Sequence, residues 1–345
     1  MADDEFDMDG LGDLSSIPNF SGGLSRLQTD PVHQQHIQKQ TEIKQQPEEI
    51  KHLQPKVIAK EEKKQEIKPI ELKNKNGTGI VKIHPFGATV ISWIVDDEEQ
   101  LFVSSKAIWN QSKAIRGGIP LVFPQFGPGK MKQHGFARVS LWKIDNIDND
   151  KGIIILSLNY NNLSEEWKKQ FPYKFTLKYK VEIKQNNDLY TELIINNDDK
   201  EKSFDFTVLF HTYFNVNSKN IKIKGLNGLN YDDTIEKNNR IKKEGSENIG
   251  ISSEVDRVYL NINDNDIVLI DDTKKIYKKI IIKRHRFFKD VVVWNPWIDK
   301  SKRMSDFDDD EYKNMVCIEA GSVAKPVTLN CGSSWIGTQT LTPSK

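Results

Sequence analysis

Residues 175–195 read F-T-L-K-Y-K-V-E-I-K-Q-N-N-D-L-Y-T-E-L-I-I, and this stretch decides the fold class. In its first half, Phe175 and every second residue through Ile183 are apolar, whereas the residues between them are Thr, Lys or Glu. This alternation is typical of a β-strand with one buried and one solvated face. A polar turn at 186–188 then leads into a second apolar stretch. The pattern predicts a long antiparallel pair of strands.

Outward from this pair, short strand-like stretches fill most of residues 67–345. Asn76-Gly77 separates two period-two stretches, which is a hairpin signal. One short helix is predicted, capped by Ser164 and ended by Pro172. Because strands do not alternate with helices, we predict an all-β fold, one large antiparallel β-sandwich over 67–345. The other predicted strands are 70–72, 80–83, 85–93, 101–103, 152–158, 204–216, 221–223, 258–260, 267–270, 277–283, 287–294, 316–319, 327–329 and 335–341.

Residues 1–66 differ in composition from the rest of the chain. Six of the first thirteen residues are acidic, and nine glutamines lie between Gln28 and Gln65. Such a segment has little apolar surface to bury, so nothing compensates the entropy that ordering would cost. We predict a disordered tail, acidic and then Gln-rich, with a transient helix near 57–67. A solvated linker and an interaction tail with unknown partners both remain open.

The overall charge excludes several kinds of partner. The 345 residues include 50 basic and 49 acidic ones, a net charge of +1. This balance gives no long-range attraction, so neither nucleic acid nor a membrane is expected as a partner. No apolar stretch approaches the roughly 20 residues that span a bilayer, and the N-terminus lacks a signal-peptide pattern. Since Cys317 and Cys331 fit no zinc spacing and allow one disulfide at most, we expect a reducing, cytoplasmic location.

The stretch from Arg116 to Trp142 has an unusual composition. It gathers five glycines, three prolines and several aromatic residues in a chain otherwise rich in Lys, Asn, Asp and Ile. The glycines open backbone conformations closed to other residues, and the prolines restrict the alternatives. We expect a rigid loop that presents Arg116 and Arg138 together with the Gln133-His134 pair. These groups suit a small polar ligand, above all an anion.

His134 and three further side chains are candidates for chemistry. Of the seven histidines, His134 and His211 remain after those in the tail and in Lys-rich surroundings are set aside. His211 ends an apolar stretch and, taken alone, is as consistent with a structural histidine as with a catalytic one. Glu319 is the one carboxylate of an apolar stretch, where it is either salt-bridged or exposed in a cleft with perturbed acidity. Asp256 precedes Arg257, which is typical of a solvated pair.

Other signals narrow the chemistry. Residues 291–297 end with Trp294 and Trp297, a surface that suits the apolar face of a sugar ring, although ordinary core packing also explains it. The sequence shows no G-x-S-x-G, no P-loop, no G-x-G-x-x-G after a strand and no metal-ligand spacing. Hydrolase, nucleotide and metal chemistries are therefore disfavoured.

Six motifs carry a resemblance to a known family. They are Arg116-Gly-Gly-Ile-Pro with Phe123-Pro124, Gln133-His-Gly-Phe-Ala-Arg138, Phe210-His-Thr-Tyr-Phe214, Asp256-Arg-Val-Tyr259, Trp294-Asn-Pro-Trp297 and Val316-Cys-Ile-Glu-Ala320. In this order they resemble the hexose-6-phosphate mutarotase group of the aldose 1-epimerase (galactose mutarotase-like) superfamily, over residues 67–345. The resemblance implies a β-supersandwich fold and interconversion of the α and β anomers of glucose 6-phosphate and related hexose phosphates. It also implies that no metal or organic cofactor takes part.

The resemblance places the general acid on His211 and the general base on Glu319. Mutarotation removes the C1 hydroxyl proton and protonates the ring oxygen, so that the ring opens, C1 rotates and the ring recloses. His211 must then be largely protonated near neutral pH, which nearby carboxylates favour and burial opposes. A phosphate dianion between two guanidinium groups would favour a sugar phosphate over a plain sugar. The implied substrate contacts are Arg116, Gln133, His134, Arg138 and Asp256.

Two other functions remain open on the sequence alone. One is a sugar-phosphate-binding or scaffolding module that acts through its Gln-rich tail. The other is an epimerase of unphosphorylated aldoses. The presence of both His211 and Glu319 favours the mutarotase over the first of these.

Overall fold

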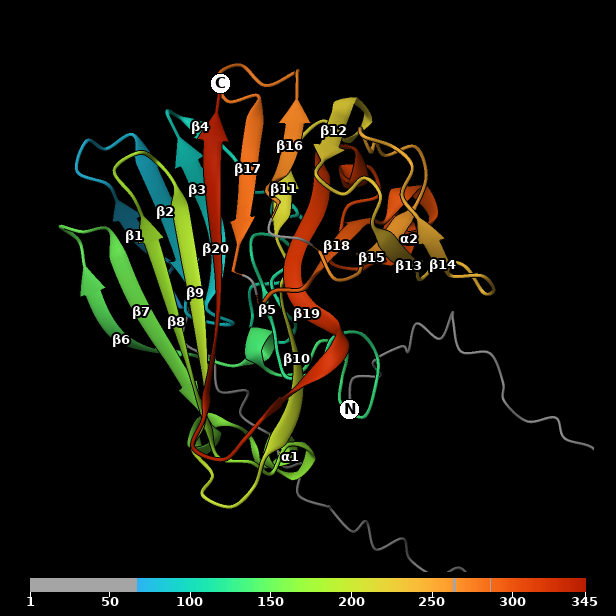
Figure 1. Ribbon diagram of the computed structural model, residues 1–345. Coiled ribbons are helices and arrows are strands. Elements are labelled where there is room, and N and C mark those ends of the chain that lie inside the picture. Colours follow the sequence, from blue (N-terminus) through green and yellow to red (C-terminus); the bar gives the residue numbers. More distant parts are fainter. Residues whose placement is uncertain (1–66, 263–264, 286) are drawn as a thin grey trace, which may run out of the picture. The chain divides into compact units, whose positions relative to one another are not determined.

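The computed structural model describes residues 67–262, 265–285 and 287–345 (Figure 1). The predicted tail, and nearly all of the transient helix expected within it, lie outside these residues. The strand pair that decided the fold class is confirmed. In it, β8 (Phe175–Ile183) runs antiparallel to β9 (Leu189–Asn197), from Phe175 opposite Asn197 to Ile183 opposite Leu189. The apolar residues of β8 are buried, as the alternation requires.

These two strands belong to the first of two large antiparallel sheets. Its strand order is β12-β16-β17-β20-β9-β8-β7-β6, so the chain's C-terminal strand lies at the centre beside β9. In Figure 1 this sheet forms a broad layer that includes β6, β7, β8, β9, β20 and β17. Its other strands are β6 (Lys143–Asp148), β7 (Ile153–Asn159), β12 (Ile221–Lys224), β16 (Ile267–Asp271), β17 (Lys279–Arg284) and β20 (Ser334–Ser344).

The second large sheet carries most of the candidate residues. Its order is β14-β13-β15-β18-β19-β10-β5, and β11 pairs with β19 beyond the end of β10. The 15-residue strand β19 is therefore its spine, with β18 on one side and β10 and then β11 on the other. The strands are β5 (Leu121–Val122), β10 (Phe204–Phe210), β11 (Tyr213–Asn215), β13 (Asn230–Asp233), β14 (Ile241–Lys243), β15 (Val255–Tyr259), β18 (Asp290–Asn295) and β19 (Met315–Leu329).

A small sheet and a few short helices complete the described residues. The sheet consists of β1 (Ile70–Lys73), β2 (Gly79–His84), β3 (Thr89–Val95) and β4 (Glu98–Glu99), and it includes the predicted hairpin around Asn76-Gly77. The predicted helix is α1 (Glu165–Gln170), whose N-cap Ser164 accepts a hydrogen bond from the Trp167 amide. The other helices are α2 (Trp297–Arg303), η1 (Ala137–Val139), η2 (Tyr160–Asn162), η3 (Ser218–Asn220) and η4 (Glu311–Asn314). None of these helices is long enough to cross a bilayer.

The main hydrophobic core lies between the two large sheets. Phe210 of β10 packs edge-on against Tyr179 of β8, and Phe206 of the same strand packs against Trp335 of β20. Because neighbouring residues of a strand face opposite ways, the second sheet has another face, and a separate apolar cluster covers it. This cluster includes Leu209, Cys317 and residues that precede η4. The predicted all-β sandwich is confirmed, and one of its sheets is covered on both faces.

Several predicted strands differ in the structure. Residues 101–103 form only isolated bridges. The expected strand 204–216 breaks at His211 and Thr212, where the backbone turns from β10 to β11. The stretches 316–319 and 327–329 belong to one strand, because residues 320–322 and 327–329 both pair with β10, on either side of a register shift. The edge strands β6 and β14, and β13 beside β14, carry no clean period-two pattern and were not predicted.

Candidate active site

A row of side chains crosses the second sheet on the face away from the main core. Asp256 of β15 lies opposite Trp294 of β18, Trp294 lies opposite Cys317 of β19, and Cys317 lies opposite Tyr213 of β11. Directly opposed residues in antiparallel strands project to the same side of a sheet. The register thus assembles residues from four of the sequence motifs, far apart along the chain, on one surface.

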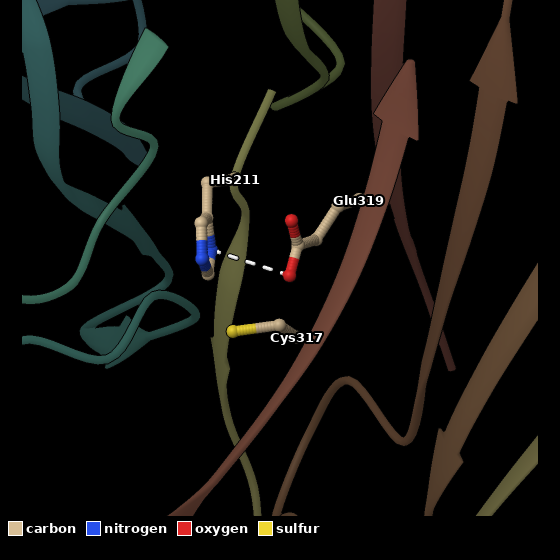
Figure 2. A group of neighbouring side chains, drawn as sticks. All are labelled: His211, Cys317 and Glu319. Atoms are coloured by element: carbon tan, nitrogen blue, oxygen red, sulfur yellow. Dashed lines mark ion pairs between the residues drawn. The ribbon is translucent and has the colours of Figure 1, made fainter. Parts of the chain in front are cut away.

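His211 and Glu319 stand beside this row. Glu319 is two residues beyond Cys317 on β19, so both side chains project to the same face. His211 lies in the break after β10, where its amide donates to the Pro120 carbonyl, and its ring stacks on Tyr213 at 4.6 Å. His211 Nδ1 lies 3.3 Å from Glu319 Oε1, and both side chains are buried, with 8% and 1% exposure (Figure 2).

Burial controls the protonation of this pair. It lowers the pKa of His211 well below 6.5, and the positive charges of Arg138 and Arg116 act in the same direction. Burial also raises the pKa of Glu319 well above 4.5, assisted by the negative charge of Asp256. The sequence left open whether the nearby carboxylates or burial control the protonation of His211, and in the ligand-free site desolvation and the two arginines shift its pKa downward. Both shifts favour the uncharged forms of the two groups, the neutral imidazole and the carboxylic acid.

Arg116 is positioned by tight backbone contacts and by two side chains. Gly117 and Gly118 follow it with φ of +125° and +68°, and a Cβ on Gly118 would lie 2.0 Å from the Val90 carbonyl oxygen. The guanidinium donates to the Tyr213 hydroxyl and to Asp306, at 3.2 Å each. Burial lowers the Arg116 pKa, but Tyr213 and Asp306 outweigh it, and the net shift is upward.

His134 and Arg138 come from the glycine-rich loop. His134 has φ of +67°, which is uncommon for any residue with a side chain. Its Nδ1 accepts a hydrogen bond from the Gly127 amide at 3.2 Å, and its ring meets that of His211 edge-on at 5.8 Å. Burial and Arg116 lower the pKa of Arg138 to about 10, so its guanidinium is still charged at neutral pH. The loop therefore brings one imidazole and one cation to the pair.

Several buried polar atoms around the pair lack a hydrogen-bond partner. Among the described residues these include Nε of Arg116 and of Arg138, Nδ1 of His211 and Oε2 of Glu319. The His211–Glu319 contact is short enough for an ion pair, but it is not aligned as a hydrogen bond. Buried polar groups are normally satisfied, so unpaired ones that converge on one place indicate a ligand site. Two cationic donors close to an acid–base pair suit a polar, anionic ligand.

The structure brings most of the predicted site residues together. His211, Glu319, Arg116, Arg138 and His134 are brought together, as the distances and mutual charge effects show. Gln133 contributes its backbone oxygen, which accepts from Arg138 Nη2 at 2.9 Å, while its side chain is exposed.

Asp256 does not form the expected pair with Arg257. Neighbours along β15 point to opposite faces, so Arg257 reaches Glu244, whereas Asp256 lies 3.8 Å from Lys300. The negative charge of Asp256 also raises the pKa of Glu319, so Asp256 lies near the His211–Glu319 pair. Its strand neighbour Trp294 meets His211 edge-on at 5.9 Å and is 8% exposed.

Three residues at the site escaped the sequence analysis. Tyr213 and Cys317 lie within the quoted motifs, and the two-residue spacing between Cys317 and Glu319 could have revealed that they share a face. Asp306 lies in an acidic stretch that gives no such signal. Spacing along the sequence did not indicate that donor atoms of His211, Cys317 and Glu319 lie within 4.8 Å of one another, a grouping with the residue types of a metal site.

Comparison with known proteins shows the family of this chain. The profile of the aldose 1-epimerase family matches residues 68–342. Two curated relatives bear the name "putative glucose-6-phosphate 1-epimerase". The one from Cenchrus ciliaris is 40% identical over 267 residues, covering 74% of this chain and 79% of its own, and the one from Escherichia coli K12 is 31% identical over 238 residues, covering 68% and 76%.

Solved structures show the same fold. A mutarotase-like protein of Salmonella typhimurium, described as a "putative mutarotase", superposes with a TM-score of 0.68 at 28% identity, covering 80% of this chain and 90% of its own. An aldose epimerase homologue of C. elegans has a TM-score of 0.63 at 13% identity, covering 81% and 99%, and supports the fold alone.

Proposed function

This chain belongs to the aldose 1-epimerase family and is an isomerase that acts on sugars, and from that premise we propose that its substrate is a hexose 6-phosphate such as glucose 6-phosphate. The observation that carries this proposal is the presence of two buried guanidinium groups, each with an unpartnered Nε–H, beside an acid–base pair. The names of the curated relatives point to the same substrate.

The arginines supply the preference for a phosphate. Arg116 and Arg138 each keep an unpaired Nε–H, and each lowers the pKa of His211 through its charge. A phosphate dianion accepts directional, charge-assisted hydrogen bonds from such donors, whereas a sugar hydroxyl uses them incompletely. With the phosphate held there, the reacting end of the sugar can turn without leaving the site.

Glu319 and His211 perform the proposed proton transfers. The C1 hydroxyl and the ring oxygen are both bonded to C1, so an acid and a base 3.3 Å apart can serve both atoms. Glu319 takes the hydroxyl proton while His211 protonates the ring oxygen, and the C1–ring-oxygen bond breaks to give the aldehyde. Rotation about C1–C2 and the reverse transfers close the ring as the other anomer. Side chains supply both transfers, so the proposed reaction requires no cofactor.

The required protonation state is one proton shift away from the favoured ligand-free state. A neutral His211 with a protonated Glu319 has the same composition as an imidazolium with a carboxylate. Arg138 and Arg116 oppose the imidazolium, and a bound dianion would cancel much of their field. Substrate binding would therefore move the proton toward His211 and prepare the pair. We further propose that residues 67–345 are the catalytic unit, in a cytoplasmic enzyme.

Saturation-transfer NMR of glucose 6-phosphate tests the proposal. The wild type should exchange the α and β anomers well above the spontaneous rate, and His211→Asn and Glu319→Gln should each reduce this exchange by about 10²–10⁴-fold. Undiminished exchange in both variants would remove the assigned roles. Equal turnover of glucose and glucose 6-phosphate would identify an epimerase of plain aldoses instead.

A further inference from the structure

Three side chains of the site form a compact set of metal-binding donors. Figure 2 shows His211, Cys317 and Glu319 converging from two neighbouring segments of the second sheet. One donor atom of each lies within 4.8 Å of the others, and each of the three residues is at most 7% exposed. Cys317 and Glu319 share a face of β19, and the register holds both beside the break that carries His211.

The donor types select the ion. Nitrogen, sulfur and carboxylate oxygen are the three ligand classes of zinc, whereas calcium and magnesium take oxygen almost alone. With zinc–nitrogen and zinc–oxygen distances of roughly 2.0–2.1 Å, a tetrahedral site places these two donors about 3.3 Å apart. The observed His211–Glu319 distance is 3.3 Å. Three protein ligands would leave the fourth position of the ion for water.

Polar atoms of two of these residues lack a hydrogen bond. Within the described part of the chain, His211 Nδ1, which lies 3.3 Å from Glu319 Oε1, is buried without a hydrogen bond, and so is the second carboxylate oxygen, Glu319 Oε2. The proposed reaction gives the Cys317 thiol no task, although it lies beside the catalytic pair. We propose that His211, Cys317 and Glu319 bind one zinc ion, or a related thiophilic divalent cation, in place of the reacting end of the sugar.

The nearby arginines do not forbid this cation. A zinc ion bound to a thiolate and a carboxylate is neutral overall. The free thiol and the free carboxylic acid are also neutral, because zinc takes the place of their two protons. Two protons leave to solvent as the two zinc bonds form. Arg116 and Arg138 therefore face an uncharged group before and after binding, while Asp256, which acts on both Cys317 and Glu319, favours the cation.

Occupation of this site has a functional consequence. The ion binds the atoms of His211 and Glu319 that would exchange protons with the ring oxygen and the C1 hydroxyl. Zinc and sugar phosphate therefore exclude each other. Zinc should then be a competitive inhibitor. This consequence rests on the proposed function, whereas the binding of the ion does not, so the two can fail separately.

Cobalt(II) titration of the full-length protein tests the site. A thiolate ligand gives Co²⁺ a charge-transfer band in the near ultraviolet, and tetrahedral coordination gives intense visible bands. We expect both bands to saturate at one ion per chain and to disappear when Zn²⁺ is added. Cobalt bound to histidines elsewhere in the chain cannot produce the thiolate band, because histidine has no thiolate. The band must therefore come from one of the two cysteines of the chain, Cys317 and Cys331.

Matched serine variants assign the band. Cys317→Ser should abolish it and weaken zinc inhibition by at least about ten-fold, whereas Cys331→Ser, at the exposed cysteine, should change neither. Circular dichroism and thermal unfolding establish that the Cys317→Ser protein is folded. A wild type without the thiolate band, or a Cys317→Ser protein that retains it, would overturn the proposal. A thiolate band with no effect of zinc on exchange would leave the metal site standing and contradict the competition.

Discussion

Asp306 holds Arg116 through a two-oxygen contact, with both carboxylate oxygens 3.2 Å from the guanidinium Nη2. The Tyr213 hydroxyl accepts from Nη1 at 3.2 Å. These contacts fix the plane of the guanidinium, whereas its buried Nε–H has no hydrogen-bond partner. Arg116 can therefore contribute in two ways, through its positive charge and through the fixed direction of its Nε–H group.

Arg116→Lys separates these two contributions. Lysine keeps the charge but lacks the planar fork and the Nε–H, so the lost charge-assisted hydrogen bond should cost about 1.5–3 kcal/mol, or roughly 10–100-fold in kcat/KM for glucose 6-phosphate. Turnover of unphosphorylated glucose, measured in parallel, should be nearly unchanged. An equal loss for both sugars would show that Arg116 supports the site as a whole instead of selecting phosphate.

The pH dependence of anomer exchange follows from the shifted pKa values of the pair. In its active state the His211–Glu319 pair holds one transferable proton. Activity therefore falls at low pH, when the neutral His211 takes up a proton and the pair holds two. Burial places this pKa well below 6.5. Activity also falls at high pH, when Glu319 loses its proton at a pKa raised well above 4.5. We expect a bell-shaped profile of kcat/KM whose acidic limb lies below 6.5.

The phosphate of the substrate also titrates, with a second pKa near 6. Profiles of kcat at saturating substrate separate its ionisation from that of the enzyme. Glu319→Gln should lose the alkaline limb together with most of its activity. An acidic limb at or above the ordinary histidine value would contradict the neutral ground state of His211.

Gly118 tests how strongly the backbone positions Arg116. A Cβ there would lie 2.0 Å from the Val90 carbonyl oxygen, at φ of +68°. Gly228 is a matched control, since its φ is +76° and no atom lies within 4 Å of a Cβ added there. Gly228→Ala should cost about 1–2 kcal/mol of unfolding free energy, and Gly118→Ala roughly 2–5 kcal/mol. Urea denaturation of both variants measures the difference, and equal losses would show that conformation alone matters.

Removal of residues 1–66 tests the proposed domain division. If 67–345 is the catalytic unit, the truncated chain should retain kcat/KM for glucose 6-phosphate to within about two-fold, because the residues of the site all lie beyond residue 100. Size-exclusion chromatography and circular dichroism verify that it folds. A large loss of exchange in a folded truncated protein would assign the first 66 residues a part in the reaction.

The fold was largely predictable because local patterns and the final structure agree. Strict alternation in 175–183 and the turn at 186–188 lead directly to β8 and β9. The breaks were harder to predict. Nothing in the apolar stretch 204–216 shows that the chain leaves the sheet at His211, because both halves pair with the same strand, β19.

The candidate site was predictable only as a set of residue types. Arg116, His211 and Glu319 were named from their motifs, whereas Asp306 was missed because its contact with Arg116 spans 190 residues. The protonation of His211 could not be derived either. It depends on how completely burial and two arginines outweigh the carboxylates, and only the packed structure determines that balance.

The strand β19 also determines what a wrongly folded copy of this protein would do. Val316, Ile318 and Ala320 face the main core, and Cys317 and Glu319 face the site. A slip of one residue against β18 would exchange the two sets, leaving the site without its carboxylate and forcing that carboxylate into the apolar core. Molecules with this mispaired strand would then be inactive, and they would not show an altered substrate specificity. The specific activity of a preparation would thus be proportional to the fraction of its molecules with the correct strand register.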